Sequence, residues 1–528
     1  MKSCATPAWL SAATVSPPPA TEISDPALVL PAAARAKCKL VLAITVDQFR
    51  YDYLTRFRSE YTGGIARLLT QGAVFTNAFY EHTPTVTAVG HATIMSGASP
   101  ILSGIVGNDW WDREMNREVT SVFDPKEKTL GAPERAAASP HRLLVSTIGD
   151  EIKMSAKGER KTIGISAKDR GAILPVGRMA DAAYWFDNES GKFVSSTWYQ
   201  KTLPGWVDTF NGQKPGEKFL GAEWRAGGVL LKKMPSKADT MFYSNMESSP
   251  FGNDLLEEFT EATIENEKLG QHAGVDLLAV SFSCNDYVGH AEGPDSPHAH
   301  DISLRTDKML AKLFAFIDKK IGMRNVVVAF TADHGVAPVP EVNTARKMPG
   351  GRLRDPEIGA AIESALNAKY GAGKWLTQAK SQYVPYLNYE LLSARRIDPR
   401  EARQVAADAV RNLPHIARVY TKDQMIEGIA ITDFLARRAH NGYYPGRGPD
   451  LVVLTEPYYM YSPRGTTHGA AYHYDAQVPV ILMGPGVKAG RYHKAAAVND
   501  IAPTLATLLD VAMPSGSMGR TLDECLTY

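Results

Sequence analysis

Acidic, imidazole and cationic side chains follow almost every strand-like segment of this 528-residue sequence. In open α/β sheets, ligands bind outside the carboxyl ends of the strands, so chemistry is expected at these positions. Taken singly, each residue has an ordinary explanation as a turn residue, a helix cap or a solvated charge. As a set they exceed what packing requires, and the set comprises Asp47, Lys168, Arg170, Asp286, His290, Asp333, His334 and His468.

Three Asp and three His in this set would supply the ligands of two zinc-like ions, because such ions bind carboxylate oxygen and imidazole nitrogen. Adjacent Asp333 and His334 can serve one ion from a tight turn, whereas Asp286 and His290 are four residues apart. Taken alone, Asp286 and His290 are equally well explained as a local hydrogen-bonded pair. The same donors also bind Mn, Co or Fe, so the residue types leave the identity of the metal open.

A candidate nucleophile lies in the segment 83–93, which has the pattern of a loop that leads into a helix. Thr87 falls near the expected helix N-terminus, where backbone N–H groups and the helix dipole favour an anion. A threonine hydroxyl is a weak nucleophile until a base or a metal lowers its pKa. The local sequence alone is explained equally well if Thr85 or Thr87 simply caps the helix.

The elements that must position these residues alternate along the chain. Short β-branched segments are separated by helical patterns, which predicts an α/β fold with a central, mostly parallel sheet and helices on both faces. Nearly all residues of the predicted strands are apolar, as in strands covered on both faces, and these strands are 39–46, 162–166, 275–281, 325–330, 450–454 and 478–483. The predicted helices are 62–71, 255–269, 302–320, 399–412 and 500–509.

We expect one catalytic domain over residues 39–528, preceded by a leader over residues 1–38. The leader is rich in Ala, Pro and Ser, and it is either a weak signal sequence or an unstructured segment. Two segments interrupt the alternation, at about 172–250 and 340–448, and we expect these insertions to cap the sheet.

The chemical residues, read together, resemble the alkaline phosphatase superfamily. Within it they are most similar to the single-chain bacterial alkaline phosphatases of the phosphate-irrepressible type, which use threonine as the nucleophile. The resemblance spans residues 39–510 in the expected order. It depends on Asp47, Thr87-x-x-Gly90-His91, Asn108, Lys168-x-Arg170, Asp286-x-x-x-His290, Asp333-His334-Gly335 and Thr467-His468-Gly469.

The resemblance implies a role for each residue at a site with two Zn²⁺. Asp47, Asp333 and His334 would hold the zinc that binds and activates Thr87. The second zinc would be held by Asp286, His290 and His468, with His473 as the rival to His468. The phosphoryl oxygens would be contacted by Asn108, Lys168 and Arg170. Lys168 would also replace the charge of the magnesium that serine-type relatives bind, and His91 would pack behind the nucleophile helix.

The function implied by the resemblance is the hydrolysis of phosphate monoesters through a phosphothreonine intermediate. A planar Arg and a point-charge Lys suit the dianion of a monoester better than the single charge of a diester. A nucleotide phosphodiesterase or pyrophosphatase shares the metal ligands and the threonine, and it is the main alternative. A non-catalytic zinc-binding protein is the alternative from a different class. A sulfatase is excluded because no Cys/Ser-x-Pro-x-Arg motif stands at the nucleophile position.

Composition and net charge limit the kinds of binding partner and the cellular location that we expect for the protein. Lys and Arg number 58 against 57 Asp and Glu, a formal net charge of +1, which does not predict a nucleic-acid partner. No apolar run reaches the length of about 18 residues that a membrane span needs. Four cysteines are too few for a disulfide framework, although a Cys38–Cys525 bridge stays open. We expect a monomer located in the periplasm or secreted, the location following from the resemblance.

Overall fold

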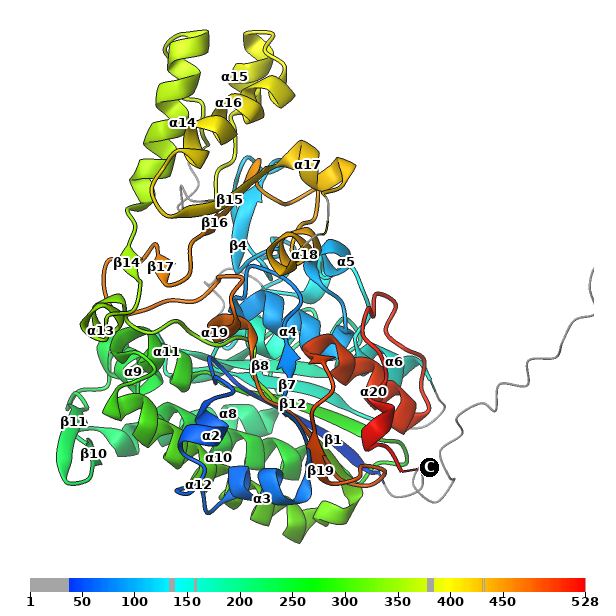
Figure 1. Cartoon of the computed structure of the whole chain (residues 1–528). Helices are drawn as coiled ribbons and strands as arrows, with labels where there is room; N and C mark the ends of the chain where they lie inside the picture. The colour runs from blue at the N-terminus through cyan, green and yellow to red at the C-terminus, as the bar shows by residue number, and fades with distance from the viewer. Residues whose placement is uncertain are drawn as a thin grey trace, which may run out of the picture.

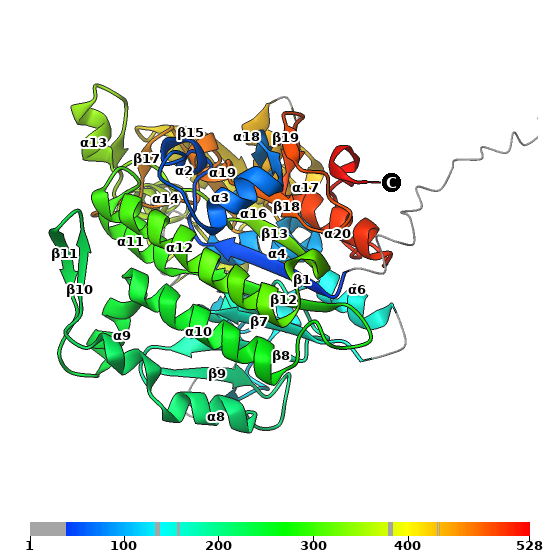
Figure 2. The same cartoon turned by 90° about the horizontal axis from the view of Figure 1, so that it is seen from below.

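A single large sheet runs through the molecule (Figures 1 and 2). The computed structural model describes residues 38–132, 138–155, 159–377, 384–429, 431 and 433–527, so only Cys38 of the predicted leader is described. Within these residues the sheet has ten strands in the order β19-β2-β18-β13-β1-β12-β7-β8-β9-β6. The five central strands are parallel, and they are β13 (Val326–Thr331), β1 (Leu40–Val46), β12 (Asp276–Phe282), β7 (Thr162–Ser166) and β8 (Ala182–Asp187).

The edges of the sheet depart from this direction. On one side β18 (Val480–Met483) runs antiparallel to β13, and β2 (Ala73–Phe75) runs antiparallel to β18. On the other side β9 (Lys192–Ser196) runs antiparallel to β8. The outermost strands are β19 (Gly490–Tyr492) and β6 (Thr129–Leu130). The prediction of a mostly parallel sheet is therefore confirmed.

Helices cover both faces of the sheet, as predicted. The face below the sheet in Figure 1 carries α3 (Gly64–Gln71), α10 (Pro250–Asn266) and α12 (Pro297–Lys320). The opposite face carries α4 (Thr87–Ser96) and α20 (Ile501–Leu509), and α7 (Asp169–Ile173) packs against α4. Because both faces are covered, every residue of β1 and β12 is buried, which explains why these strands are apolar throughout.

The segment 172–250 does more than cover the sheet. It contributes β8 and β9 to the sheet itself, and it adds α8 (Gly205–Gly212) and α9 (Thr240–Glu247). It also contains a hairpin formed by β10 (Glu223–Ala226) and β11 (Val229–Lys233). This segment is therefore part of the core architecture.

The described residues of 340–461 form a second body, here called the cap, which rises above the carboxyl edge of the sheet in Figure 1. It has its own apolar core, which includes Ile362 and Trp375. Its elements include α14 (Asp355–Tyr370), α15 (Tyr389–Ala394), α16 (Pro399–Arg411), β15 (Ile416–Thr421), α17 (Lys422–Glu427), α18 (Phe434–Asn441) and β16 (Leu451–Thr455).

The strand predicted at 450–454 forms as β16, but it lies in the cap and pairs antiparallel with β15. The prediction that it is covered on both faces was wrong, because three of its five residues are only half-buried. A short apolar segment is compatible with either environment, and its sequence did not distinguish them.

Two further expectations bear on the whole chain. Cys38 and Cys525 are both buried free thiols, so the bridge between them is not formed. Among the described residues, no helix combines the length and the apolar character needed to cross a bilayer.

Candidate active site

Four neighbouring strands bring most of the predicted site residues to one edge of the sheet. Asp47 follows β1, Lys168 follows β7 and Asp333 follows β13. Asp286 lies in the first turn of α11 (Cys284–Glu292), directly after β12. Since these strands are adjacent and parallel, their carboxyl ends meet, and residues far apart in the sequence become neighbours.

Thr87 is the first residue of α4 and is only 1% exposed. All ten residues of α4 are buried, because the helix is enclosed by the sheet and its neighbours. The next residue, Ala88, donates its backbone N–H to Asn108 Oδ1 at 2.8 Å, which fixes Asn108 beside the helix N-terminus. Gly90 lets the helix approach the Asp333 loop, since a Cβ there would lie 2.1 Å from the Asp333 carbonyl oxygen.

The first donor group surrounds the ring of His334. His334 Nε2 lies 3.4 Å from Thr87 Oγ1, 3.4 Å from Asp47 Oδ1 and 3.5 Å from Asp333 Oδ2. Its Nδ1 must carry the proton, because Nδ1 lies 3.0 Å from the Gly335 carbonyl oxygen, which only accepts. Nε2 therefore turns a lone pair toward three oxygens. Asp47 Oδ1 and Asp333 Oδ2 are also buried without a hydrogen-bond partner.

The second donor group shows the same pattern. His290 Nε2 lies 3.2 Å from Asp286 Oδ1 and 3.2 Å from His468 Nε2. The two Nδ1 atoms donate to backbone carbonyls, His290 to Thr466 at 2.9 Å and His468 to Thr85 at 2.8 Å. When both rings are neutral, their Nε2 lone pairs face each other beside the Asp286 carboxylate. A cation would satisfy this arrangement, and backbone acceptors behind metal-binding imidazoles are the usual support.

The pKa values of the residues in the two donor groups are shifted in different directions. Burial and the neighbouring Asp333 raise the pKa of Asp47 well above its usual range, against the charge of Lys168. Burial also lowers the pKa of His334, and burial together with His334 and His290 lowers the pKa of His468. These two imidazoles are therefore neutral, which is the form that binds a metal. Burial would lower the pKa of His290, but the Asp286 carboxylate outweighs it and raises that pKa.

Lys168 lies between the two donor groups. Its Nζ donates to Asp47 Oδ2 and to Asp286 Oδ2, both at 2.6 Å, and the residue is 5% exposed. Burial alone would lower the pKa of Lys168, but the Asp286 and Asp47 carboxylates raise it above its usual value. Lys168 is therefore a fixed positive charge, and it forms ion pairs with both carboxylates.

Three further residues that the sequence analysis named, Arg170, His91 and His473, have different positions relative to the two donor groups. Arg170 lies in α7, where its Nη1 forms an ion pair with Asp169 Oδ1 at 3.6 Å. His91 Nδ1 donates to the Thr87 carbonyl at 2.8 Å and lies 3.3 Å from Asp333 Oδ2, and its Nε2 lies 2.7 Å from Ser281 Oγ. His473 is exposed and packs against Phe79 and Phe434, away from both donor groups.

One polar residue of the site was missed by the sequence analysis. Gln48 is buried, and its side-chain Nε2 donates to Asp286 Oδ1 at 2.5 Å. Its backbone N–H donates to Asp333 Oδ1 at 3.1 Å, so this one residue contacts a carboxylate of each donor group. The backbone is left-handed, with φ of 63°, which is uncommon for a residue other than glycine. The only sequence signal was its place directly after Asp47.

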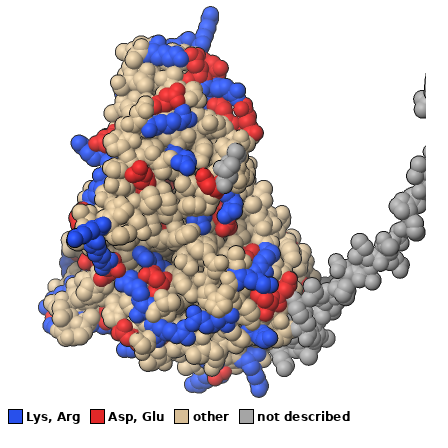
Figure 3. All heavy atoms as spheres, in the orientation of Figure 1, with Lys and Arg blue, Asp and Glu red and all other residues tan. Residues whose placement is uncertain are grey.

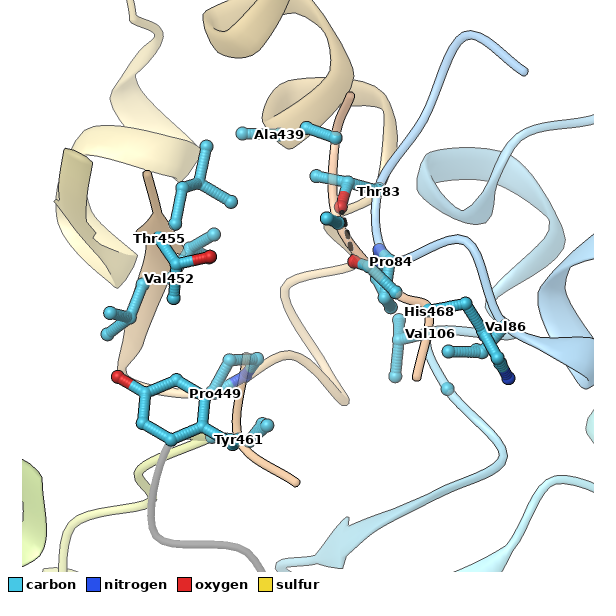
Figure 4. Close-up of a pocket in the computed structure, with 18 of the residues that line it drawn as sticks. Thr83, Pro84, Val86, Val106, Ala439, Pro449, Val452, Thr455, Tyr461 and His468 are labelled. Atoms are coloured by element: carbon cyan, nitrogen blue, oxygen red, sulfur yellow. Dashed lines mark hydrogen bonds between the residues drawn. The ribbon is translucent and has the colours of Figure 1, made fainter. Parts of the chain in front are cut away.

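A cleft of about 360 Å³ lies beside the site, between the core and the cap. Figure 4 shows one wall with Thr83, Pro84, Val86 and His468, where the Thr83 hydroxyl donates to the Gly469 carbonyl at 3.1 Å. The opposite wall is formed by the cap strand β16. Around the molecule, positive and negative side chains are interspersed on the face that Figure 3 shows, in agreement with the near-zero net charge.

A buried threonine at a helix N-terminus, beside imidazole and carboxylate donors on an α/β sheet, is the arrangement expected of a metal-dependent hydrolase. Comparison with known proteins agrees. The family model described as type I phosphodiesterase / nucleotide pyrophosphatase matches residues 41–474. The chain belongs to this family, within the alkaline phosphatase superfamily.

Several relatives in the family are named alkaline phosphatases. PhoV of Synechococcus elongatus is 36% identical, over 93% of this chain and 93% of that protein. PafA of Elizabethkingia meningoseptica is 32% identical, over 92% of this chain and 94% of that protein. The crystal structure of PafA matches with a TM-score of 0.86, covering 93% of this chain and 99% of that chain.

Proposed function

We propose that this protein is an alkaline phosphatase, which hydrolyses phosphate monoesters through Thr87 with two zinc ions. The observation that carries the proposal is the surroundings of the Thr87 hydroxyl. It lies at the N-terminus of a fully buried helix, 3.4 Å from His334 Nε2, beside two buried carboxylate oxygens that have no hydrogen-bond partner. The relatives named alkaline phosphatases support the same conclusion.

The donor sets fit two metal ions, and we assign them as the resemblance implies. Asp47, Asp333 and His334 would hold the ion at Thr87, and Asp286, His290 and His468 would hold the other. Three-residue clusters with ligand-like spacing occur at both places, Asp47, Asp286 and His334 in one and Asp286, His290 and His468 in the other. When bound, such ions lower the pKa of a hydroxyl or water and neutralise charge on the attacking and leaving oxygens.

The chain's own groups account for the rest of the reaction. The Thr87 oxygen forms a bond to phosphorus as the ester bond breaks, and the alcohol leaves. The N-terminus of α4 stabilises the negative charge on the phosphoryl group through its backbone N–H groups. Asn108, whose Oδ1 accepts from the Ala88 N–H, and Arg170 would orient the phosphoryl oxygens. Water then cleaves the phosphothreonine and releases phosphate.

The positive charges favour a monoester as the substrate. Lys168 stays protonated because the Asp286 and Asp47 carboxylates raise its pKa, and Arg170 is permanently charged. Two cations match the dianion of a monoester better than the single charge of a diester. A monoester also lacks the second ester group that a diesterase must accommodate.

The test compares kcat/KM of the zinc-loaded protein for an aryl phosphate monoester and the matching diester. We expect a strong preference for the monoester. Lys168→Ala should lower monoester turnover by about 100-fold, as expected for loss of a charged contact in the transition state, and should affect diester turnover much less. A preference of the wild type for the diester would make the protein a phosphodiesterase, and equal losses of the variant on both substrates would remove the role assigned to Lys168. Bound zinc with no turnover of either would leave a metal-binding protein without this activity.

We also propose that the protein is a monomer in the periplasm or outside the cell, on the basis of the resemblance to bacterial alkaline phosphatases. Cell fractionation with phosphatase activity as the marker tests the location. Light scattering of the purified protein tests the oligomeric state.

A further inference from the structure

We propose that the cleft between the core and the cap binds the alcohol portion of the substrate, and that it selects neutral alcohols that carry an aromatic ring. This inference rests on the proposed phosphomonoesterase function and adds the class of substrate to it. The volume of about 360 Å³ falls within the range of roughly 300–1,000 Å³ that is typical of small-molecule sites.

The inner end of the cleft lies beside the reacting groups. Val86, the residue before Thr87, is part of its wall, and so is Asn108, whose Oδ1 accepts from Ala88 N–H at 2.8 Å. Thr467 and His468 line the cleft from the side of the second donor group. An ester with its phosphorus at Thr87 and its leaving oxygen at that donor group therefore extends its alcohol past Thr467 and His468 into the cleft.

The walls are apolar and rich in aromatic rings. Pro84, Val86 and Val106 lie on the core side, and Val452 lies opposite them on β16 (Figure 4). The aromatic side chains around the cleft include Trp111, Tyr386, Tyr459, Tyr461 and Tyr472. Such rings supply a large contact area and stack against flat ligands. These walls favour an aromatic alcohol over a small aliphatic one.

The charges around the cleft exclude a second class of alcohol. Among the lining residues that the structure describes, none is Lys or Arg, and the acidic residues are Asp109, Glu118 and Asp475. An alcohol with its own carboxylate or phosphate would therefore find no cationic partner among these lining residues, which selects against it.

The experiment measures kcat/KM of the zinc-loaded full chain for benzyl phosphate, methyl phosphate and phosphoglycolate. Benzyl alcohol and methanol are of similar acidity, so a difference between their esters reports binding of the alcohol rather than its leaving ability. We expect benzyl phosphate to be preferred over methyl phosphate by about tenfold or more, because a hydrophobic pocket discriminates on that scale. Phosphoglycolate, whose alcohol carries a carboxylate, should be the poorest substrate.

Val452→Asp places a charge on the cap wall of the cleft. It should lower kcat/KM for benzyl phosphate by about tenfold and change that for methyl phosphate by less than about twofold. The matched control is Val229→Asp, at an exposed valine on the β10–β11 hairpin, and it should change neither value. Tyr461→Ala removes an aromatic ring from the cleft. This variant tests the preference for benzyl phosphate over methyl phosphate if Val452→Asp fails to fold.

The outcomes separate this inference from the proposed function. Wild-type protein that does not prefer benzyl phosphate overturns the inference, and so do folded variants that lose both substrates equally. Wild-type protein that binds zinc and turns over none of the three esters overturns the proposed function and the inference together.

Discussion

Thr87 and Thr85 are two buried hydroxyls only two residues apart, yet their contacts differ. Thr85 Oγ1 donates to the Ala470 carbonyl at 2.9 Å, whereas Thr87 Oγ1 faces His334 Nε2. Only Thr87 is therefore directed toward the donor groups. The helix-cap explanation, which the sequence left open, does not hold for Thr87, because it follows the N-cap residue Val86, and α4 has no side-chain cap.

Thr87→Ala should abolish the phosphoenzyme and lower kcat by about 10⁴-fold or more, because removal of a nucleophile from a concerted site has losses of that order. Acid quenching with ³²P-labelled substrate measures the covalent phosphate. The control is Thr85→Ala, which should retain the phosphoenzyme. Labelled protein recovered from the Thr87 variant would assign the nucleophile to a different hydroxyl.

Gln48→Met keeps the volume of the side chain and removes its N–H donor. Because Gln48 Nε2 holds Asp286 Oδ1, we expect zinc affinity to fall by about 10- to 100-fold, as for other outer partners of metal ligands. Competition with a chelator measures that affinity independently of turnover. Gln71→Met, at an exposed glutamine on α3, is the control, and equal affinities for the two variants would remove Gln48 from the site.

The residue types of the site were predictable to a large extent, and its geometry was not. Asp47, Asp333 and Asp286 could be found because each follows an apolar strand. Gln48 could not be found in this way, because its role depends on a left-handed backbone and on a contact with a residue 238 positions away. The engagement of Lys168 by two carboxylates likewise depends on which strands are neighbours.

The elements followed from the sequence wherever burial was uniform. The strands at 39–46 and 162–166 are apolar because both faces of the sheet are covered, and the structure has β1 and β7 at these places. For β16 the same kind of segment belongs to a two-stranded sheet in the cap. Apolar character reports burial, but the partner of a strand is decided by the tertiary fold.

The end of α9 contains a buried carboxyl that links stability to pH. Glu247 is 6% exposed, and its Oε2 accepts from Asn188 Nδ2 at 2.8 Å. Burial raises the pKa of Glu247 to about 7. A raised pKa means that the folded state holds the proton more tightly, so this contribution to stability is complete below about pH 4.5 and is lost as the pH rises through about 7.

Glu247→Gln mimics the protonated side chain. At pH 8 we expect the variant to unfold with a free energy about 1–3 kcal/mol higher than the wild type, whereas at pH 4.5 the two should be similar. Chemical denaturation of zinc-saturated protein at both pH values measures the difference. Glu265→Gln, at a largely exposed position on α10, should show no such trend. A Glu247 variant that is equally stable at pH 8 would contradict the prediction.

The cap and the core are joined through a buried carboxylate. Asp450 accepts from the Tyr389 hydroxyl at 2.6 Å and from Leu387 N–H at 2.9 Å, both in the cap. Arg113, from the turn between β4 (Asp109–Asp112) and β5 (Arg117–Thr120), lies 3.4 Å from the same carboxylate. This contact is one of those that hold the cap above the active site.

Asp450→Asn removes the buried negative charge that Arg113 contacts at 3.4 Å, and Arg403, at 3.5 Å, keeps its ion pair with Asp423. We expect a loss of about 3 kcal/mol of stability, because removal of one member of a buried ion pair has a cost of that order. The cap should also become more sensitive to limited proteolysis than the core. Asp408→Asn, at an exposed aspartate in α16, is the control. Unchanged stability and unchanged proteolysis would show that other contacts hold the cap.

The position of β1 at the middle of the sheet has a consequence for how the polypeptide folds. Among the described residues it is the first strand, but its two neighbours begin only at Asp276 and Val326. During synthesis, neither edge of this apolar strand can therefore pair until more than half of the polypeptide has been made. Pairing over such separations is slow, and unpaired apolar edges aggregate. A nascent chain that stops before residue 326 cannot complete the centre of the sheet, so protection of the newly made N-terminal strand, rather than the rate of helix formation, should limit the yield of active protein.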